Sequence, residues 1–166
     1  MRVIGIDPGF ATTGYAVIER GEGRLRAVDI GAVSTPSGAP QAERLLVLQS
    51  AIAALLERHR PAAVSVERLF FNVNVRTAMA VGQASGVALV TAAAAGVPVI
   101  EYTPLEVKRA VVGVGNAGKP QVGRMVTSLL GLDAPPQPPD AADACAVAIC
   151  HLTGERLRVA VARAAT

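Results

Sequence analysis

Residues 2–9 read Arg-Val-Ile-Gly-Ile-Asp-Pro-Gly, and this stretch decides the fold that we expect. Its apolar β-branched run has no polar interruption, which predicts a central strand buried on both faces. Asp7 with Pro8 and Gly9 is typical of a turn. A second apolar run at residues 15–18 follows, so the two runs predict a β-hairpin. Because an ionised carboxylate at the end of a buried strand is costly unless it is compensated, Asp7 needs an explanation.

Two explanations of Asp7 are open from this stretch alone. It is either a turn residue that bonds to its own backbone or a metal-ligating carboxylate. The remainder of the chain decides between them by whether it supplies partner ligands.

Length and composition indicate one folded domain. The chain has 166 residues, of which 51% are apolar and 17% charged, and this composition excludes a disordered protein. We expect a single domain over residues 1–153 and a frayed tail over residues 154–166. No apolar run reaches transmembrane length and no charged-then-apolar leader is visible, so we expect a cytoplasmic protein without a membrane contact.

The charge balance favours a polyanionic partner. The net charge is +3, and the cations are fourteen Arg and two Lys. If several carboxylates are neutralised in one site, the remaining surface is more basic than this sum indicates. Cys145 and Cys150 have the wrong spacing for a metal clip or a disulfide, so we expect reduced, partly buried thiols.

The hydrophobic pattern predicts an α/β fold. Three antiparallel strands lead into parallel βαβ units, which gives a five-stranded mixed sheet flanked by helices on both faces. The expected strands cover residues 2–7, 15–18, 25–33, 62–67 and 97–102, and the expected helices cover residues 41–60, 74–95, 104–113, 119–130 and 140–152.

Four carboxylates lie where an element begins or ends. Asp7 and Glu67 end two strands, while Asp140 and Asp143 lie three residues apart at the start of the last helix and so point to one side. Strand ends converge at one edge of an open α/β sheet. Without a cation these groups would repel one another. Together they indicate a site for Mg²⁺, although Asp140 alone fits a helix N-cap and Glu67 alone a surface strand end.

Two metal ions about 4 Å apart can activate a water molecule and stabilise the leaving 3′ oxygen of a phosphodiester. The chain shows no Ser-His-Asp arrangement. We expect His59 to be a solvated helix residue and His151 to lie near the C-terminus of a helix, where the dipole favours it.

Several motifs resemble the RuvC crossover-junction endodeoxyribonuclease family, and they span residues 1 to about 153. They are Ile4-Gly5-Ile6-Asp7-Pro8-Gly9, Thr13-Gly14-Tyr15, Val66-Glu67, Phe70-Phe71-Asn72, Gly82-Gln83-Ala84-Ser85-Gly86-Val87, Glu101-Tyr102-Thr103-Pro104, Val107-Lys108 and Asp140-Ala141-Ala142-Asp143-Ala144.

The resemblance implies a ribonuclease-H-like fold and an activity. The family cuts Holliday junctions, which are four-way DNA junctions, by paired symmetric nicks that leave 5′-phosphate and 3′-hydroxyl ends. The implied cofactor is Mg²⁺, with Mn²⁺ as a substitute and two ions per active site, and no nucleotide cofactor is implied. The implied partners are a second copy of the chain in a homodimer and the branch-migration proteins RuvA and RuvB. The family's catalytic and metal-binding positions fall on Asp7, Glu67, Asp140 and Asp143.

An aromatic loop follows the strand that ends in Glu67. Phe70 and Phe71 are two of five aromatic residues. An aromatic side chain beside a site can stack on an unpaired base at roughly 1–3 kcal/mol per base. We expect one of the two to anchor the loop and the other to stack, and the resemblance favours Phe70 as the wedge. The neighbouring residues expected to contact DNA are Asn72, Asn74 and Arg76.

The only two lysines flank a Gly-rich loop. Lys108 and Lys119 are either solvated or bind phosphate, and the resemblance favours phosphate contacts. Arg124 is a further candidate on the helix that Lys119 begins. The helix at residues 74–95 is rich in small residues, which is compatible with an ordinary buried helix or with a helix that also packs on a partner subunit.

Three other functions remain open at this stage. A junction-binding protein without catalysis is one, and a related nuclease of the same fold acting on other branched DNA or RNA is another. An actin-like or sugar-kinase ATPase also ends its first strand in an Asp-x-Gly turn, but that fold needs two such domains.

Overall fold

The computed structural model describes the backbone of residues 1–68 and 75–164 and the side chains of residues 1–68 and 78–154. The described elements follow the predicted order. They are β1 (Arg2–Asp7), β2 (Thr12–Gly21), β3 (Arg24–Ser34), α1 (Gln41–His59), β4 (Ala63–Glu67), α2 (Val75–Ala94), β5 (Val99–Tyr102), α3 (Pro104–Val112), α4 (Lys119–Leu130) and α5 (Pro139–Ala164).

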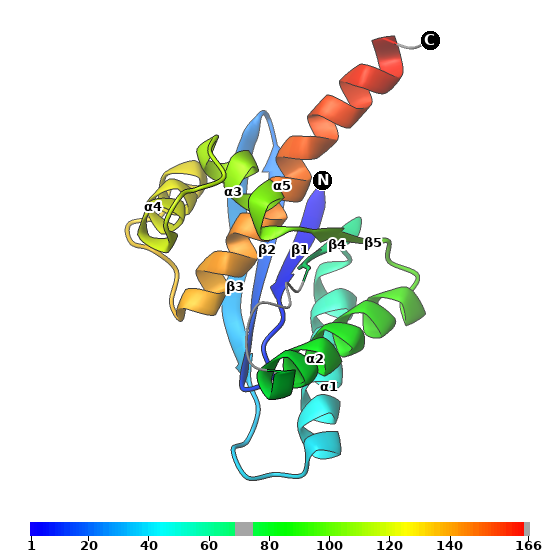
Figure 1. Cartoon of the computed structure of the whole chain (residues 1–166). Coiled ribbons are helices and arrows are strands. Elements are labelled where there is room, and N and C mark those ends of the chain that lie inside the picture. Colours follow the sequence, from blue (N-terminus) through cyan, green and yellow to red (C-terminus); the bar gives the residue numbers. More distant parts are fainter. Residues whose placement is uncertain (69–74, 165–166) are drawn as a thin grey trace.

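The five strands form one mixed sheet in the order β3-β2-β1-β4-β5 (Figure 1). β2 is antiparallel to both β1 and β3, whereas β4 is parallel to β1 and β5 is parallel to β4. The predicted fold class is therefore confirmed. β1 lies at the centre of the sheet, and four of its six residues are buried, as its uninterrupted apolar run predicted.

Helices cover both faces of the sheet (Figure 1). Ile4 and Ile6 of β1 belong to the core under α1 and α2, whereas Val3 belongs to the core under α5. The alternation along β1 therefore serves two cores, because successive side chains of a strand point to opposite faces. α3 and α4 pack outside α5 and complete that second core.

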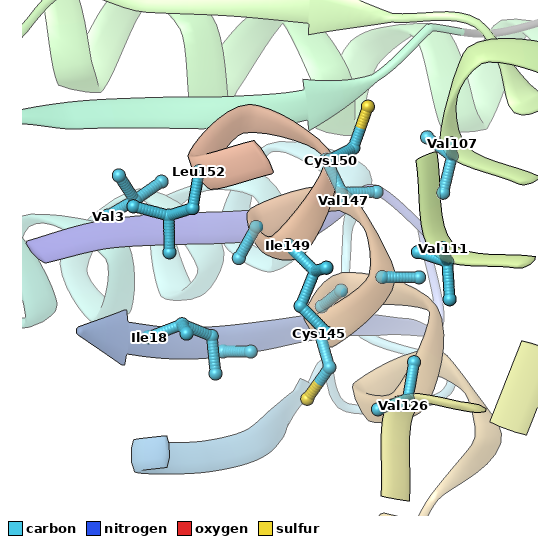
Figure 2. Packing of buried hydrophobic residues seen from close by; sticks show 14 of the residues in the cluster. Val3, Ile18, Val107, Val111, Val126, Cys145, Val147, Ile149, Cys150 and Leu152 are labelled. Atoms are coloured by element: carbon cyan, nitrogen blue, oxygen red, sulfur yellow. The ribbon is translucent and has the colours of Figure 1, made fainter. Parts of the chain in front are cut away.

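α5 is enclosed between the sheet and the helices α3 and α4. Figure 2 shows its residues Val147 and Ile149 among side chains from the sheet and from α3 and α4. A helix that is apolar all round is typical of such an interior position. Cys145 and Cys150 are reduced thiols with 0% and 4% exposure, so they are more deeply buried than predicted.

Local signals explain most helix boundaries. The Thr103 side chain accepts a hydrogen bond from the Glu106 amide, and the Glu106 carboxylate accepts one from the Thr103 amide, which gives α3 a complete capping box.

The predicted end of the last helix near Leu152 is wrong, because the α5 backbone continues to Ala164. The domain boundary at residue 153 stays a prediction. None of the described helices is both long and apolar enough to cross a membrane.

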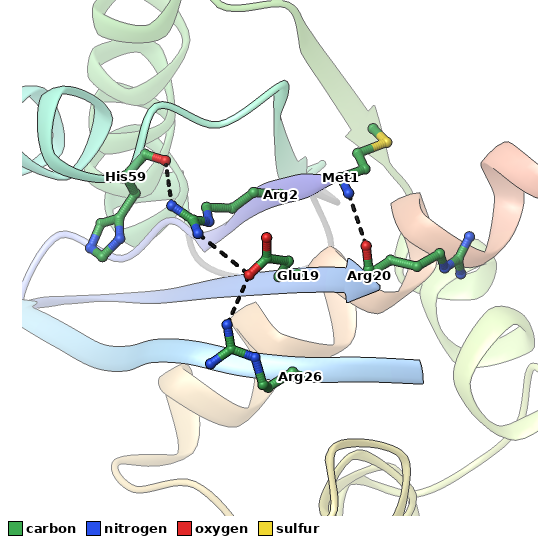
Figure 3. Close-up of polar contacts among 6 residues, drawn as sticks. All are labelled: Met1, Arg2, Glu19, Arg20, Arg26 and His59. Atoms are coloured by element: carbon green, nitrogen blue, oxygen red, sulfur yellow. Dashed lines mark hydrogen bonds and ion pairs between the residues drawn. The ribbon is translucent and has the colours of Figure 1, made fainter. Parts of the chain in front are cut away.

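Ion pairs tie together the sheet end where β1 begins (Figure 3). The Glu19 carboxylate lies 3.4 Å from Arg2 Nη2 and 2.9 Å from Arg26 Nη2, and Arg2 Nη1 donates to the His59 carbonyl. His59 itself is only 6% exposed, and its Nε2 lies 3.2 Å from Asp29 Oδ2. The prediction of a solvated His59 is therefore wrong. At this end of the sheet, the charge of Glu19 is matched by two arginines.

Candidate active site

Two carboxylates end adjacent parallel strands on the same face of the sheet. Asp7 is the last residue of β1, and Glu67 is the last residue of β4. Val3 and Ala63, which face the α5 side, lie an even number of residues before them, so both carboxylates also begin on the α5 side. A hydrogen bond links the two side chains. The pairing of β1 with β4 therefore brings together residues sixty positions apart in the sequence.

Two glycines let α5 lie directly on the sheet. A Cβ on Gly5 would lie 2.2 Å from the Ala144 carbonyl oxygen, and one on Gly14 would lie 1.9 Å from the Asp140 carbonyl oxygen. Both distances are too short for any other residue without displacement of the helix. The first turn of α5 is thereby held against β1 and β2, where Asp140 and Asp143 approach the strand ends.

The electrostatics of Asp7 show how closely the acids gather. The pKa of Asp7 is raised from 3.8 to about 8, first by burial. The negative charges of Glu67, Asp143 and Asp140 follow as causes, in that order. The Lys119 ammonium acts against them and lowers this pKa. Asp7 is therefore largely protonated near neutral pH when no divalent cation is bound.

The second strand-end carboxylate is perturbed in the same direction. Burial raises the pKa of Glu67, and the Asp143 charge adds to this rise. Lys119, the hydrogen bond to Asp7 and Lys108 oppose it. Desolvation and like charge are the recognised causes of raised carboxyl pKa values, and they cluster at functional sites.

Lys119 supplies a compensating positive charge. Its Nζ donates a hydrogen bond to Asp143 Oδ2 at 2.7 Å, and the Lys119 side chain is 79% exposed against 25% for Asp143. This hydrogen bond is the first cause of the raised pKa of Lys119. Lys119 is the first residue of α4, so the N-terminus of that helix lies beside the acids.

The chemistry of the donors fits a hard divalent cation. Carboxylate oxygens are the ligands that Mg²⁺ prefers, and a divalent cation would offset the like charges that raise the pKa of Asp7. Within the described part of the chain, however, no three His, Cys, Asp or Glu side chains are arranged so that they could hold a metal ion directly. Lys119 already neutralises part of this negative charge through its ion pair with Asp143.

The residues predicted to contact DNA fall into two groups. Phe70, Phe71, Asn72 and Asn74 lie outside the described residues, as does the side chain of Arg76 in α2.

The basic residues beside the acids are described. Lys119 and Arg124 line a hollow of about 300 Å³ that also includes Asp143. Lys108 lies in α3, and its charge reaches Glu67. This hollow joins α4 to the first turn of α5, so two of the three predicted basic residues whose side chains are described border Asp143.

A buried polar pair lies under the Glu67 side of the site. Tyr102 pairs with Glu67 in the sheet register, and its hydroxyl lies 3.0 Å from His151 Nδ1 of α5. His151 is 5% exposed and lies within α5, not near its C-terminus as predicted. No local sequence pattern indicates this pair, because it depends on how α5 crosses β5.

Comparison with known proteins gives one consistent family. A model of the family described as crossover junction endodeoxyribonuclease RuvC matches residues 3–151. The RuvC of Chloroflexus aggregans is 56% identical over 151 residues, which cover 91% of this chain and 92% of that protein. The RuvC of Syntrophomonas wolfei is 53% identical over 157 residues, which cover 95% and 91%.

Solved structures agree with this result. Thermus thermophilus RuvC, solved in complex with a Holliday junction substrate, superposes with a TM-score of 0.89 at 40% identity and covers 95% of this chain and 96% of that one. The yeast mitochondrial Holliday junction resolvase Ydc2 has a TM-score of 0.64 at 15% identity, covers 90% and 78%, and shows a shared fold alone. The fold is the ribonuclease-H-like fold that the sequence resemblance implied.

Proposed function

The chain belongs to the crossover junction endodeoxyribonuclease RuvC family, and we propose that it resolves Holliday junctions with an active site formed by Asp7, Glu67, Asp140 and Asp143. The observation that carries this assignment is the convergence of Asp7 and Glu67, hydrogen-bonded at the ends of adjacent strands, with the first turn of α5, which packs closely on the sheet. Acids from β4 and from the start of α5 thus act on Asp7 of β1 at a single edge of the sheet. Such a concentration of negative charge destabilises the fold unless a ligand compensates it.

The four acids would hold divalent cations, Mg²⁺ in the first instance with Mn²⁺ as a substitute, and two ions per site. When bound, such ions lower the pKa of a coordinated water and stabilise the leaving oxygen of the phosphodiester. Asp7 and Glu67 come from rigid strand ends and fix the position of the site. Asp140 and Asp143 come from the start of α5 and close it from the other side. The family membership supports a metal-dependent nuclease, and the oxygen-only donor set supports Mg²⁺ or Mn²⁺.

Basic residues around the acids would guide the DNA backbone. Lys119 and Arg124 border the hollow beside Asp143, and Lys108 lies close enough to influence Glu67. Cations at such positions bind backbone phosphates without reading sequence. The loop residues Phe70, Phe71, Asn72 and Asn74, together with Arg76, remain our candidates for contacts with the unpaired bases at the junction.

A homodimer would supply two active sites for two symmetric nicks. On α2, Met79 and Val90 are 63% and 61% exposed, and their separation of eleven residues places them on one side of the helix. On α1, Leu46 is 62% exposed. Exposed apolar side chains on two adjacent helices support a protein contact there. Met79→Lys is expected to increase the monomer fraction in sedimentation velocity, whereas Leu129→Lys in α4 serves as the control.

Two further assignments follow from the family membership. We propose that RuvA and RuvB are partners and that the protein works in the cytoplasm with the chromosomal DNA of its bacterial host. Co-sedimentation with RuvA-bound junctions tests the first assignment.

The decisive experiment uses a synthetic mobile four-way junction with Mg²⁺ and maps the cut on each strand. Paired symmetric nicks with ligatable ends are expected. Asp7→Asn should abolish cleavage while junction binding, measured without metal, stays largely intact. Equal loss of binding and cleavage would contradict the catalytic role of Asp7, and wild-type protein that binds but never nicks would identify a non-catalytic junction-binding protein.

A further inference from the structure

An arginine of α1 holds the turn that follows Asp7. Arg44 Nη2 donates to the Phe10 carbonyl oxygen at 3.1 Å, and Arg44 Nε donates to Thr35 Oγ1 at 2.9 Å. The guanidinium carbon also lies 3.9 Å from the centroid of the Phe10 ring. One planar group therefore uses an edge for two hydrogen bonds and a face for a cation–π contact, which a lysine ammonium could not reproduce.

Thr35, directly after β3, holds the same turn. We call Arg44 and Thr35, with their contacts to Phe10 and Ala11, the clamp. Its Oγ1 donates to the Phe10 carbonyl oxygen at 2.7 Å, and its amide donates to the Ala11 carbonyl oxygen at 3.0 Å. The Phe10 carbonyl thus accepts from two side chains that lie on different elements. The position of the turn relative to β3 and α1 depends on this shared acceptor.

The turn is fixed from its other side as well. Thr13 Oγ1 donates to the Gly9 carbonyl oxygen at 2.7 Å. A Cβ on Gly9 would lie 2.1 Å from the Thr12 carbonyl oxygen, so the chain folds back tightly on itself. Because residues 9–11 are each held by a neighbouring group, little freedom remains for Asp7, which lies two residues before Gly9.

Arg44 has no comparable role elsewhere in the described structure. It forms no ion pair with a described carboxylate and belongs to neither buried core. Within the described part of the chain, its side-chain hydrogen bonds and its cation–π contact are made to Phe10 and Thr35. Its removal should therefore loosen the turn without a large loss of global stability.

We infer that Arg44 is a positioning residue that holds Phe10, and through it the turn and the Asp7 carboxylate, in the position that the active site requires. This inference rests on the proposed catalytic role of Asp7. Asp7 is the last residue of β1 and stands directly before this turn. A misplacement of about 1 Å can lower a catalysed rate about a hundredfold, so a clamp at this point has a direct consequence for cleavage.

Arg44 also borders a hollow of about 290 Å³ with Phe10, Met79 and Gln83. A free guanidinium edge in a surface hollow could instead bind a DNA phosphate, and the experiment has to separate the two roles. Thr35→Val makes this possible, because it removes the hydroxyl shared by Arg44 and Phe10 and leaves the charge of Arg44 unchanged.

The test compares Arg44→Ala, Arg44→Lys and Thr35→Val with the wild type, and Arg26→Ala is the matched control. Arg26 is 70% exposed and forms one ion pair at the other end of the sheet. The measurements are hydrogen exchange of the amides of residues 9–13 in metal-free protein, the Mg²⁺ concentration for half-maximal single-turnover cleavage, the maximal rate, and junction affinity without metal.

All three clamp variants should exchange the turn amides at least about tenfold faster, require several-fold more Mg²⁺ and cleave at least about tenfold more slowly. Junction affinity should stay within about twofold of the wild type, and Arg26→Ala should match the wild type throughout. Unchanged exchange and unchanged Mg²⁺ dependence in Arg44→Ala would overturn the inference. A second pair of results would also overturn it: Thr35→Val cleaves normally, and Arg44→Ala binds the junction more weakly and with less salt dependence. These results would identify Arg44 as a residue that contacts a DNA phosphate. Cleavage by Asp7→Asn would instead refute the proposed active site.

Discussion

The α carbon of Gly14 faces the main-chain oxygen of Asp140 so closely that a Cβ there would lie 1.9 Å from that oxygen. Gly14 belongs to the second strand of the first hairpin, and Asp140 belongs to the first turn of the last helix. This close contact joins two segments that lie far apart in the sequence, and it does so beside the candidate active site. It makes the position of Asp140 and Asp143 depend on a residue that carries no functional group.

Gly14→Ala should therefore impair cleavage without removing a ligand. The added methyl group would meet backbone atoms of Asp140 and Ala141, which cannot rotate away as a side chain could, so α5 has to move away from β2. We expect a loss of at least about a hundredfold in single-turnover cleavage and of about 1–3 kcal/mol in the free energy of unfolding. Gly21→Ala is the control, because Gly21 ends the same strand and a Cβ there meets nothing within 4 Å. Equal cleavage by the two variants would show that the close contact does not position the acids.

The raised pKa of Asp7 predicts a pH-dependent stability of the metal-free protein. Asp7 binds a proton up to about pH 8 in the folded state but only up to about pH 3.8 in the unfolded state. Its stabilising contribution is therefore complete below pH 3.8 and is lost as the pH rises through 8. Urea unfolding in EDTA should show a lower free energy of unfolding at pH 8.5 than at pH 6.

Asp7→Asn should remove most of this pH dependence, because asparagine does not titrate. At pH 8.5 without metal we expect the variant to be more stable than the wild type by about 1 kcal/mol or more, since one unit of pKa corresponds to about 1.4 kcal/mol. Added Mg²⁺ should stabilise the wild type and have little effect on the variant. A variant that is less stable than the wild type under metal-free conditions at pH 8.5 would contradict the charge repulsion.

The strands and the two strand-end acids could be predicted from sequence because the signals are local. An uninterrupted apolar run followed by Asp7-Pro8-Gly9 marks both the strand and its end, and Glu67 ends a run of the same kind. The parallel pairing of the two strands then follows from the helix between them. The catalytic roles of these acids stay predictions, now with a geometry that supports them.

The remaining features depend on packing between distant segments. The Lys119–Asp143 ion pair requires α4 to pack beside α5, which no local pattern specifies. Gly14 marks the hairpin in the sequence, but its contact with Asp140 is evident only once α5 lies on β2. His59 differs, because Leu48, Ile52 and Leu56 recur at helical spacing and His59 continues their buried side. The burial of His59 therefore follows from a local helical pattern and does not depend on contacts between distant segments.

Burial predicts inert thiols. Cys145 is fully buried, and burial raises the pKa of its thiol to about 12, so almost no thiolate is present near neutral pH. Cys150 is 4% exposed. Native protein should therefore release little colour with Ellman's reagent over minutes, and denaturant should make both thiols react. Rapid reaction of one thiol in the native protein would show that α5 opens readily from the sheet.

The charge of Lys119 should lower the pKa of Asp7 in a measurable way. Lys119→Met removes the one cation that acts on Asp7, among the groups that the structure describes, so this pKa should rise. The ¹³C carboxyl shift of Asp7, followed by NMR titration of metal-free protein, reports the change directly. Arg124→Met is the matched control, since Arg124 lines the same hollow but is not among the causes of the shift in Asp7. A pKa of Asp7 that stays constant in Lys119→Met, or that rises equally in Arg124→Met, would show that Lys119 is not the compensating charge of the acid cluster.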